Sequence, residues 1–116
     1  MTKPVVLVLD DEAAILRTTT LILQREGYTV VAAASAAEAL YRLKTEPADL
    51  ILLDCILGHE SVIQEARRHN PDVRVAIFTF DPTLNDSPLA EIVLYKPVSP
   101  RALLTTIADM CIAKAA

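Results

Sequence analysis

The stretch VVLVLDDE, residues 5–12, joins a short apolar run directly to three carboxylates. Residues 5–9 are rich in valine and lack polar alternation, which is typical of a fully buried strand in a parallel sheet. Asp10, Asp11 and Glu12 follow at once, and at roughly 5 Å and an effective dielectric near 20 each like-charged pair costs about 3 kcal/mol before solvent relieves it. A buried strand that ends in this way predicts a site where a cation offsets the repulsion.

The composition is that of one globular domain. The chain has 116 residues, of which 53% are hydrophobic and 22% charged, so it can build a single core without disulfides. No apolar run reaches the length of a bilayer span, and the start lacks the basic and apolar blocks of a signal peptide, so we expect a soluble, cytoplasmic protein. The net charge of −4 comes without the basic stripe of a nucleic-acid binder, so neither nucleic acid nor membrane is an expected partner.

Cysteine and histidine are sparse. Cys55 and Cys111 are too few for a disulfide framework, and a reducing compartment suits two free thiols. A metal site built from Cys55 and His59 is disfavoured, because no second pair of ligands accompanies them. The densest basic cluster, residues 67–69, is interpreted as a solvated helix face.

The apolar period switches repeatedly between strand and helix, and this alternation predicts the architecture. Strands that alternate with helices imply a parallel sheet covered on both faces. Gly27 fits a helix C-cap, Ser35 with Glu38 fits a capping box, and Ser99 with Pro100 fits an N-cap followed by the first helical residue. The predicted strands are residues 5–9, 28–33, 50–53, 73–80 and 92–95, and the predicted helices are residues 12–26, 35 to about 45, a short one starting in SVIQ (61–64) by capping at Ser61 and ending by Pro71, and one from Ser99 onward.

Polar residues follow four of the predicted strands. In an open parallel sheet, ligands bind beyond the carboxyl ends of the strands, beside the point where the strand order reverses. We therefore expect these side chains to converge at one edge of the sheet. They are Asp10 and Asp11 after the first strand, Asp54 after the third, Thr79 at the fourth and Lys96 after the fifth.

The chemistry of these groups suits phosphoryl transfer. Clustered carboxylates bind a hard divalent cation such as Mg²⁺, Lys96 suits a phosphate oxygen or a carboxylate in its absence, and Thr79 can donate a hydrogen bond. A carboxylate flanked by these groups is equipped to attack phosphorus. Each residue taken singly has a simpler interpretation: a strand-end cap for Asp54, an ordinary strand residue for Thr79 and a surface charge for Lys96. Their joint occurrence at strand ends favours a functional site. Glu12 is expected to favour the start of a helix.

The segments LVLDDE, DLILLD, VAIFT and YKPVSPRALL occur in the order and spacing of one known family. The chain resembles the response regulator receiver domain of two-component signalling over nearly its whole length, as a single domain of residues 1–116. The resemblance implies a flavodoxin-like (βα)5 three-layer sandwich with a five-stranded parallel sheet. It also implies site roles: phosphoacceptor Asp54, direct Mg²⁺ ligand Asp11, water-mediated ligand Asp10, a further metal ligand in the Ile56 carbonyl, and phosphoryl-binding Thr79 and Lys96, with a cis Lys96–Pro97 bond.

Two loops depart from the family pattern. After the acceptor, CILGHESVIQ has Gly58 at the usual proline position and is shorter by about one helical turn, so the third helix is expected to be short. Between Thr79 and Lys96 the family has a complete helix, whereas FDPTLNDSPLAEIVLY contains Pro82 and Pro88. A reduced or absent fourth helix is therefore expected there.

The residues that switch conformation in the family also differ. Val93 stands where the family has a rotating aromatic; Tyr95 is a candidate substitute on the same face of the strand, although a plain core or edge tyrosine is the favoured interpretation. Phe80 follows Thr79, where the family has a small residue, and Ile56 is apolar. This pair predicts slow hydrolysis of an aspartyl phosphate.

The resemblance predicts a phosphorylation-dependent signalling switch. Asp54 would accept a phosphoryl group from a histidine kinase or phosphotransfer protein with Mg²⁺ as cofactor, and the protein would not be an enzyme beyond its own phosphoryl transfer and slow autodephosphorylation. Because no output domain follows Ala116, we expect output through an unidentified protein partner, unless the chain is part of a longer regulator. Two alternatives stay open: a degenerate receiver that acts as a constitutive interaction module, and a phosphohydrolase with Asp10 as nucleophile.

Overall fold

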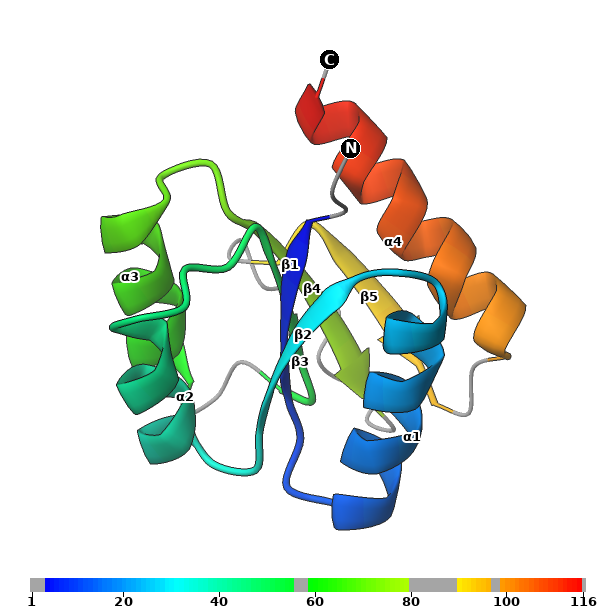
Figure 1. Ribbon diagram of the computed structural model, residues 1–116, viewed down its shortest axis with the longest axis horizontal. Helices are drawn as coiled ribbons and strands as arrows, with labels where there is room; N and C mark the ends of the chain where they lie inside the picture. Colours follow the sequence, from blue (N-terminus) through cyan, green and yellow to red (C-terminus); the bar gives the residue numbers. More distant parts are fainter. Residues whose placement is uncertain (1–3, 56–58, 80–89, 97–98, 116) are drawn as a thin grey trace.

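The computed structural model describes residues 4–55, 59–79, 90–96 and 99–115 (Figure 1). The predictions made for Ile56, Gly58, Phe80, Pro97 and the reduced helix between the fourth and fifth strands concern positions outside these residues. The elements in chain order are β1 (Val5–Leu9), α1 (Ala13–Arg25), β2 (Thr29–Ala33), α2 (Ala36–Leu43), β3 (Leu50–Leu53), α3 (Glu60–His69), β4 (Arg74–Thr79), β5 (Ile92–Tyr95) and α4 (Pro100–Ala115).

The five strands form one parallel sheet in the order β2-β1-β3-β4-β5 (Figure 1). Val6 of β1 pairs with Val30 on one side and with Leu50 on the other, so β1 lies between β2 and β3. The chain thus moves outward to β2 and then returns across β1 to β3. This reversal places the ends of β1 and β3 at the topological switch point, and the predicted flavodoxin-like architecture is confirmed.

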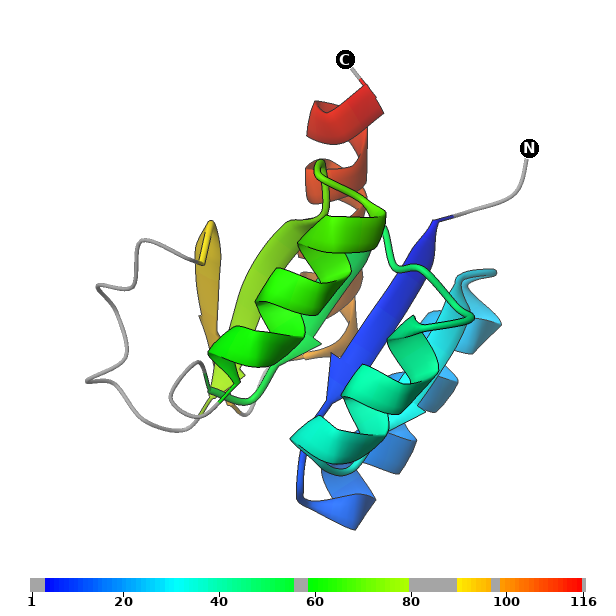
Figure 2. The same ribbon diagram turned by 90° about the vertical axis from the view of Figure 1, so that its left-hand side faces the viewer.

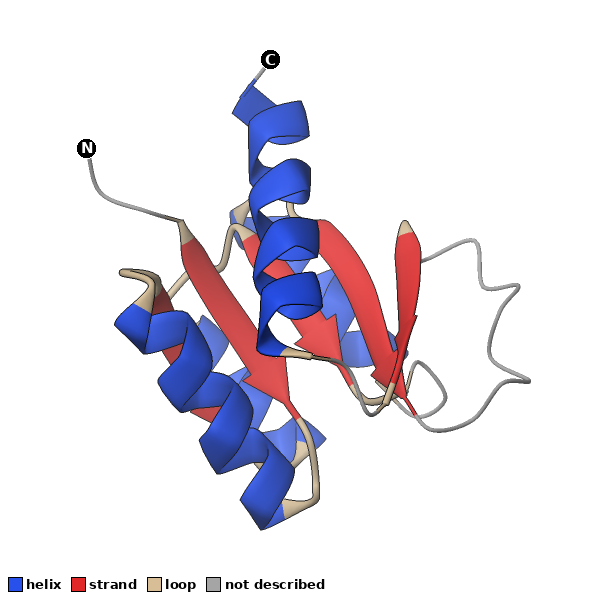
Figure 3. Cartoon of the chain, turned by 90° about the vertical axis from the view of Figure 1, so that its right-hand side faces the viewer, coloured by secondary structure: helices blue, strands red, loops and turns tan. Residues whose placement is uncertain are grey.

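Helices cover both faces of the sheet, and each face has its own apolar core. Helices α2 and α3 cover one face (Figure 2), and α1 and α4 cover the other (Figure 3). Because side chains alternate between the faces along every strand, Leu7 and Leu9 pack in the core on the α2 and α3 side, whereas Val6 and Val8 pack in the core on the α1 and α4 side. Both faces of β1, β3 and β4 are buried, which explains why these strands are nearly continuous apolar runs.

Local signals placed most element ends correctly. Gly27 has a φ of 100° at the end of α1, the left-handed conformation that glycine adopts without steric cost. The hydroxyl oxygen of Ser35 accepts the Glu38 N–H at 3.1 Å, and that of Ser99 accepts the Ala102 N–H at 3.1 Å. The N-caps predicted for α2 and α4 are therefore confirmed.

Other predicted ends shifted. Helix α2 ends at Leu43, two residues before the predicted end, and β2 begins at Thr29 rather than at Tyr28. The predicted cap of α3 at Ser61 is wrong: the helix begins at Glu60 with His59 as N-cap, and no side chain caps it. The His59 carbonyl accepts the first helical hydrogen bond from Val62 N–H at 3.0 Å, so main-chain geometry sets the start. Helix α3 has ten residues and ends at His69, before Pro71 as predicted, while its shortening relative to the family stays a prediction.

In the described part of the chain, no helix combines the length and the apolar character that crossing a bilayer requires.

Candidate functional site

The site forms where β1 and β3 end, beside the switch point. The sheet ladder continues one residue beyond each strand, because Asp10 N–H donates to the Ala33 carbonyl at 3.2 Å and Asp54 N–H donates to the Leu9 carbonyl at 3.1 Å. These two main-chain bonds hold the carboxylates on neighbouring strand ends. The strand-end rule used on the sequence therefore placed Asp10 and Asp54 correctly.

Three carboxylates gather at this edge. Oxygen atoms of Asp10, Asp11 and Asp54 lie within 4.8 Å of one another. Asp11 N–H donates to Asp54 Oδ2 at 3.4 Å, and Glu12 N–H donates to Asp10 Oδ1 at 2.9 Å. The backbone of the β1–α1 loop thus orients the buried Asp10 carboxylate and the partly buried Asp54 carboxylate, whereas Asp11 is exposed to solvent and ions.

Lys96 neutralises one of these charges. Its Nζ lies 2.5 Å from Asp10 Oδ2, and the side chains of Lys96 and Asp10 are only 5% and 4% exposed. Lys96 N–H donates to the Thr79 carbonyl at 2.7 Å, and Nζ also lies 5.1 Å from the centre of the Phe78 ring. Lys96 thus lies at the carboxyl edge of the sheet, and its ammonium links the end of β5 to the end of β1 through Asp10.

Asp54 is less well neutralised than Asp10. Its side chain is 16% exposed, and no hydrogen bond among the described residues reaches its buried Oδ1 atom. Burial raises the pKa of Asp54, the Asp11 N–H opposes this shift, and the negative charge of Asp10 adds to it. A buried carboxylate oxygen without a hydrogen bond attracts an incoming cation or electrophile.

The other predicted residues occupy different settings. Thr79 is buried at the end of β4, and Tyr95 is its partner in β5. Val93 packs against the core on the α2 and α3 face, whereas Tyr95 is 41% exposed. Tyr95 therefore resembles an edge tyrosine, and its candidacy for switching, like that of Val93 and Thr79, stays a prediction. The switch candidate Phe80 and the metal ligand Ile56 lie outside the described residues.

One contact of Asp54 was not foreseen from the sequence. His59 Nδ1 lies 3.6 Å from Asp54 Oδ1 and donates a hydrogen bond to the Cys55 carbonyl at 2.9 Å. Cys55 Sγ lies 3.9 Å from the same nitrogen, and burial followed by the charge of Asp54 raises the pKa of the thiol. The four-residue separation of Cys55 and His59 was the available signal, but it did not reveal that both reach Asp54.

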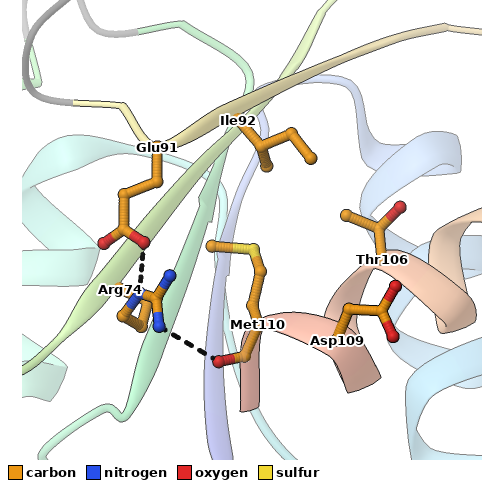
Figure 4. Close-up of a pocket in the computed structure, with 6 residues that line it drawn as sticks. All are labelled: Arg74, Glu91, Ile92, Thr106, Asp109 and Met110. Atoms are coloured by element: carbon orange, nitrogen blue, oxygen red, sulfur yellow. Dashed lines mark hydrogen bonds and ion pairs between the residues drawn. The ribbon is translucent and has the colours of Figure 1, made fainter. Parts of the chain in front are cut away.

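A separate hollow of about 220 Å³ lies between β5 and α4 (Figure 4). Arg74 forms an ion pair with Glu91 there and donates from Nη1 to the Met110 carbonyl at 3.2 Å. Arg74 begins β4 and Ile92 begins β5, so the hollow lies at the amino ends of the strands. It is therefore at the opposite edge of the sheet from Asp54, and its ion pair ties β4 to the chain entering β5.

The carboxylate cluster fits a hard divalent cation. Mg²⁺ prefers oxygen ligands, usually one or two carboxylates with several waters. Asp10, Asp11 and Asp54 supply carboxylate oxygens from two strand ends. The donor set at this edge is thus consistent with the predicted cofactor.

Comparison with known proteins places the chain among signalling proteins. The family model described as response regulator receiver domain matches residues 6–108. The transcriptional regulatory protein AlgB of Pseudomonas putida is 43% identical over 77 residues, which cover 64% of this chain and 17% of AlgB. The transcriptional regulatory protein PhoP of Bacillus subtilis is 35% identical over 105 residues, covering 83% of this chain and 43% of PhoP. The chain thus spans less than half the length of either relative.

Solved structures agree with this placement. A CheY-like receiver domain protein from Methanospirillum hungatei is 28% identical with a TM-score of 0.82, and the match covers 98% of both chains. TrrA from Thermotoga maritima, determined in complex with Mg²⁺ and BeF, is 24% identical with a TM-score of 0.78, covering 93% of this chain and 99% of that one. The latter likeness concerns the fold.

Proposed function

The chain belongs to the response regulator receiver domain family of two-component signalling, and from this premise we propose that it is a phosphorylation-dependent switch with Asp54 as acceptor. The observation that carries the proposal is the buried Asp54 Oδ1, which has no hydrogen-bond partner among the described residues and lies in a cluster that also holds Lys96 through Asp10. The main-chain bond from Asp54 N–H to the Leu9 carbonyl holds the residue at the strand end, and its unsatisfied Oδ1 is the proposed nucleophile.

The remaining residues have complementary roles in the proposal. Asp54 attacks phosphorus, the bond from phosphorus to the donor breaks, and its electron pair leaves with the donor group. Asp11, Asp10, Asp54 and the Ile56 carbonyl would hold Mg²⁺, which would supply positive charge for the transferring phosphoryl group. The buried pair of Lys96 with Asp10 supports a role for the ammonium at the phosphoryl group, because Lys96 is already at the cluster and needs only a new partner. Thr79 donates its hydroxyl to another phosphoryl oxygen.

The partners follow from the same assignment. The donor is a histidine kinase or a phosphotransfer protein carrying phosphohistidine, and the setting is the cytoplasm. Because the curated relatives are transcriptional regulators, we propose that phosphorylation controls an output of that kind, by contact with a protein partner or with a linked domain. Beyond its own phosphorylation and slow dephosphorylation, the domain performs no further catalysis.

One observation favours a second function. Val93, at the position of the family's rotating aromatic, is partly buried and packs against the core, while the nearby Tyr95 is already substantially exposed. A receiver with this arrangement can keep its acceptor and still act as a constitutive interaction module. The phosphohydrolase alternative gains no such support, because Asp10 is engaged by Lys96 and by the Glu12 N–H and is the less available nucleophile.

The decisive experiment is phosphorylation by a small donor. We expect the protein to gain one phosphoryl group with Mg²⁺ and acetyl phosphate, measured by intact mass, and Asp54→Asn to gain none. Labelling that persists in Asp54→Asn and disappears in Asp10→Asn would indicate the phosphohydrolase instead. No labelling of the parent chain by acetyl phosphate or by a broad kinase panel would support the constitutive module, as would partner affinity that is unchanged by phosphorylation.

A further inference from the structure

The proposed acceptor, Asp54, lies close to two side chains of different ligand chemistry, the Cys55 thiol and the His59 imidazole. The ligand atoms of Asp54, Cys55 and His59 all lie within 4.8 Å of one another. His59 Nδ1 lies 3.6 Å from Asp54 Oδ1 and 3.9 Å from Cys55 Sγ. The Asp54 Oδ1 atom that faces this histidine is buried and has no hydrogen-bond partner among the described residues. The structure therefore supplies a third ligand to the Cys55 and His59 pair.

These separations are close to those of a tetrahedral zinc centre. With Zn–N and Zn–O near 2.0 Å and Zn–S near 2.3 Å, nitrogen and oxygen ligands lie about 3.3 Å apart, and nitrogen and sulfur ligands about 3.5 Å apart. The distances in the protein exceed these values by about 0.3 Å and about 0.4 Å, which is within the reach of side-chain rotation. The chain fixes both partners near Asp54, because Cys55 is its neighbour in sequence and His59 begins α3.

We propose that Asp54, Cys55 and His59 form a second metal site, which binds Zn²⁺ and chemically similar ions and leaves one position for water. Thiolate and imidazole ligands select borderline and soft ions, whereas Mg²⁺ requires hard oxygen ligands. Zn²⁺ and Mg²⁺ would thus approach Asp54 from different ligand sets, the first with Cys55 and His59 and the second with Asp10 and Asp11.

Binding requires two protons to move. The Cys55 thiol releases its proton to solvent, since only the thiolate is a ligand. His59 Nδ1 now donates to the Cys55 carbonyl, so the imidazole proton must transfer to Nε2 and this 2.9 Å hydrogen bond is given up. The loss of one neutral hydrogen bond is small beside the free energy that metal ligation supplies.

The consequence is competition at the acceptor. An Asp54 carboxylate that ligates Zn²⁺ through Oδ1 has a cation on the oxygen proposed to attack phosphorus. Bound Zn²⁺ therefore blocks phosphorylation of Asp54, and a phosphorylated Asp54 no longer completes the zinc site. This consequence rests on the proposed function, whereas the binding of Zn²⁺ does not.

Cobalt and zinc binding test the site directly. We expect Co²⁺ to give a thiolate-to-metal charge-transfer absorption in the parent protein that is lost in Cys55→Ser and kept in Cys111→Ser. We expect Zn²⁺ affinity, measured by calorimetry without Mg²⁺, to fall at least about tenfold in Cys55→Ser and in His59→Gln, as loss of even an outer-shell partner can cost. His69→Gln is the matched control and keeps the parent affinity. Equal Zn²⁺ affinities in the parent chain and in these three variants would overturn the proposal, because the ion would then sit on the carboxylates alone.

A second arm tests the competition. Acetyl phosphate with Mg²⁺ alone first establishes whether the parent chain and Cys55→Ser are labelled. If they are, one equivalent of Zn²⁺ should abolish labelling of the parent chain and spare Cys55→Ser; equal labelling of both would overturn the competition. If neither is labelled by acetyl phosphate with Mg²⁺ alone, nor by the kinase panel, the proposed function fails while the cobalt spectra still decide the metal site. Melting curves of each variant without metal confirm that the fold is intact.

Discussion

The buried pair of Lys96 and Asp10 predicts a large loss of stability when the lysine is removed. Lys96→Met removes the ammonium and retains an unbranched side chain that can still contact the Phe78 ring. Asp10, only 4% exposed, then has a carboxylate with the Glu12 N–H as partner but without its cation. Asp11 and Asp54 place two further negative charges within 4.8 Å.

The expected magnitude follows from this geometry. Removing one partner of a buried ion pair costs about 3–5 kcal/mol, because an uncompensated charge is left in a poorly solvated site. Domains of this size unfold with a free energy of about 5–15 kcal/mol, so the loss is a large fraction of the total and lowers the melting temperature by roughly 10–20 °C. Replacing Asp10 as well removes the stranded charge, and Asp10→Asn/Lys96→Met should recover about half of the loss or more.

Urea unfolding followed by circular dichroism in Mg²⁺-free buffer measures these free energies. Lys44→Met is the matched control, since Lys44 is exposed at the end of α2 and such surface changes stay within about 0.5 kcal/mol. A Lys96→Met loss below about 1 kcal/mol would refute the reasoning. A coupling energy between the two substitutions below about 0.5 kcal/mol would refute it equally, since contacting charges couple by more than that.

Three further predictions concern the acceptor and two helices. In Mg²⁺-free buffer Asp54→Asn should raise the free energy of unfolding by about 1 kcal/mol, because it removes charge repulsion worth about 3 kcal/mol per pair before solvent relieves it. Added Mg²⁺ should shift the urea midpoint less in this variant than in the parent chain. An equal shift would count against Asp54 as a Mg²⁺ ligand. Ser35→Ala and Ser99→Ala should each lower stability by about 0.5–2 kcal/mol in the same assay, and no change would mean that these caps are replaced by water. A hydrogen bond from His69 lowers the pKa of Glu65. The Glu65 carboxylate therefore stabilises the fold above its ordinary pKa of 4.5, and this stabilisation is lost as pH falls through the lowered pKa. The melting-temperature difference between the parent chain and Glu65→Gln should narrow from about pH 6 to pH 3, and a difference that widens would contradict the lowered pKa.

Local and periodic signals explain which parts of the fold could be predicted. The strand 5–9 was placed to the residue because a parallel strand buried on both faces is a continuous apolar run. The caps at Ser35 and Ser99 were found because their hydroxyls act within three residues. The start of α3 was misplaced because the His59 carbonyl begins it, and a main-chain acceptor carries no side-chain signature.

Some parts of the site could be predicted from the sequence, and others depend on tertiary contacts. Strand ends of a parallel sheet meet at one edge, so Asp10, Asp54 and Lys96 could be brought together from topology alone. The sequence could not predict that Asp10 is the carboxylate that pairs with Lys96. Lys96 Nζ lies at the end of a flexible side chain, and its position depends on contacts made in the folded protein. His59 was missed for a similar reason: its distance to Asp54 depends on how the β3–α3 connection is shaped, and period and spacing do not encode that shape.

Asp54 is the point where the two proposed metal sites and the phosphoryl group compete. Asp10 has Lys96 and the Glu12 N–H as partners, whereas Asp54 has one 3.4 Å hydrogen bond at Oδ2 and, among the described residues, none at Oδ1. An incoming electrophile or cation therefore gains most at Asp54 Oδ1, because an unsatisfied buried acceptor has the most to recover. Which ion binds Asp54 depends on the neighbouring ligands. On the β1 side, where Oδ2 accepts the Asp11 N–H, hard carboxylates favour Mg²⁺ and leave Oδ1 for the phosphoryl group. On the α3 side, the Cys55 thiol and the His59 imidazole favour Zn²⁺ at Oδ1, which blocks the acceptor. Replacing only Cys55 and His59 should thus leave a receiver site that responds to Mg²⁺ alone.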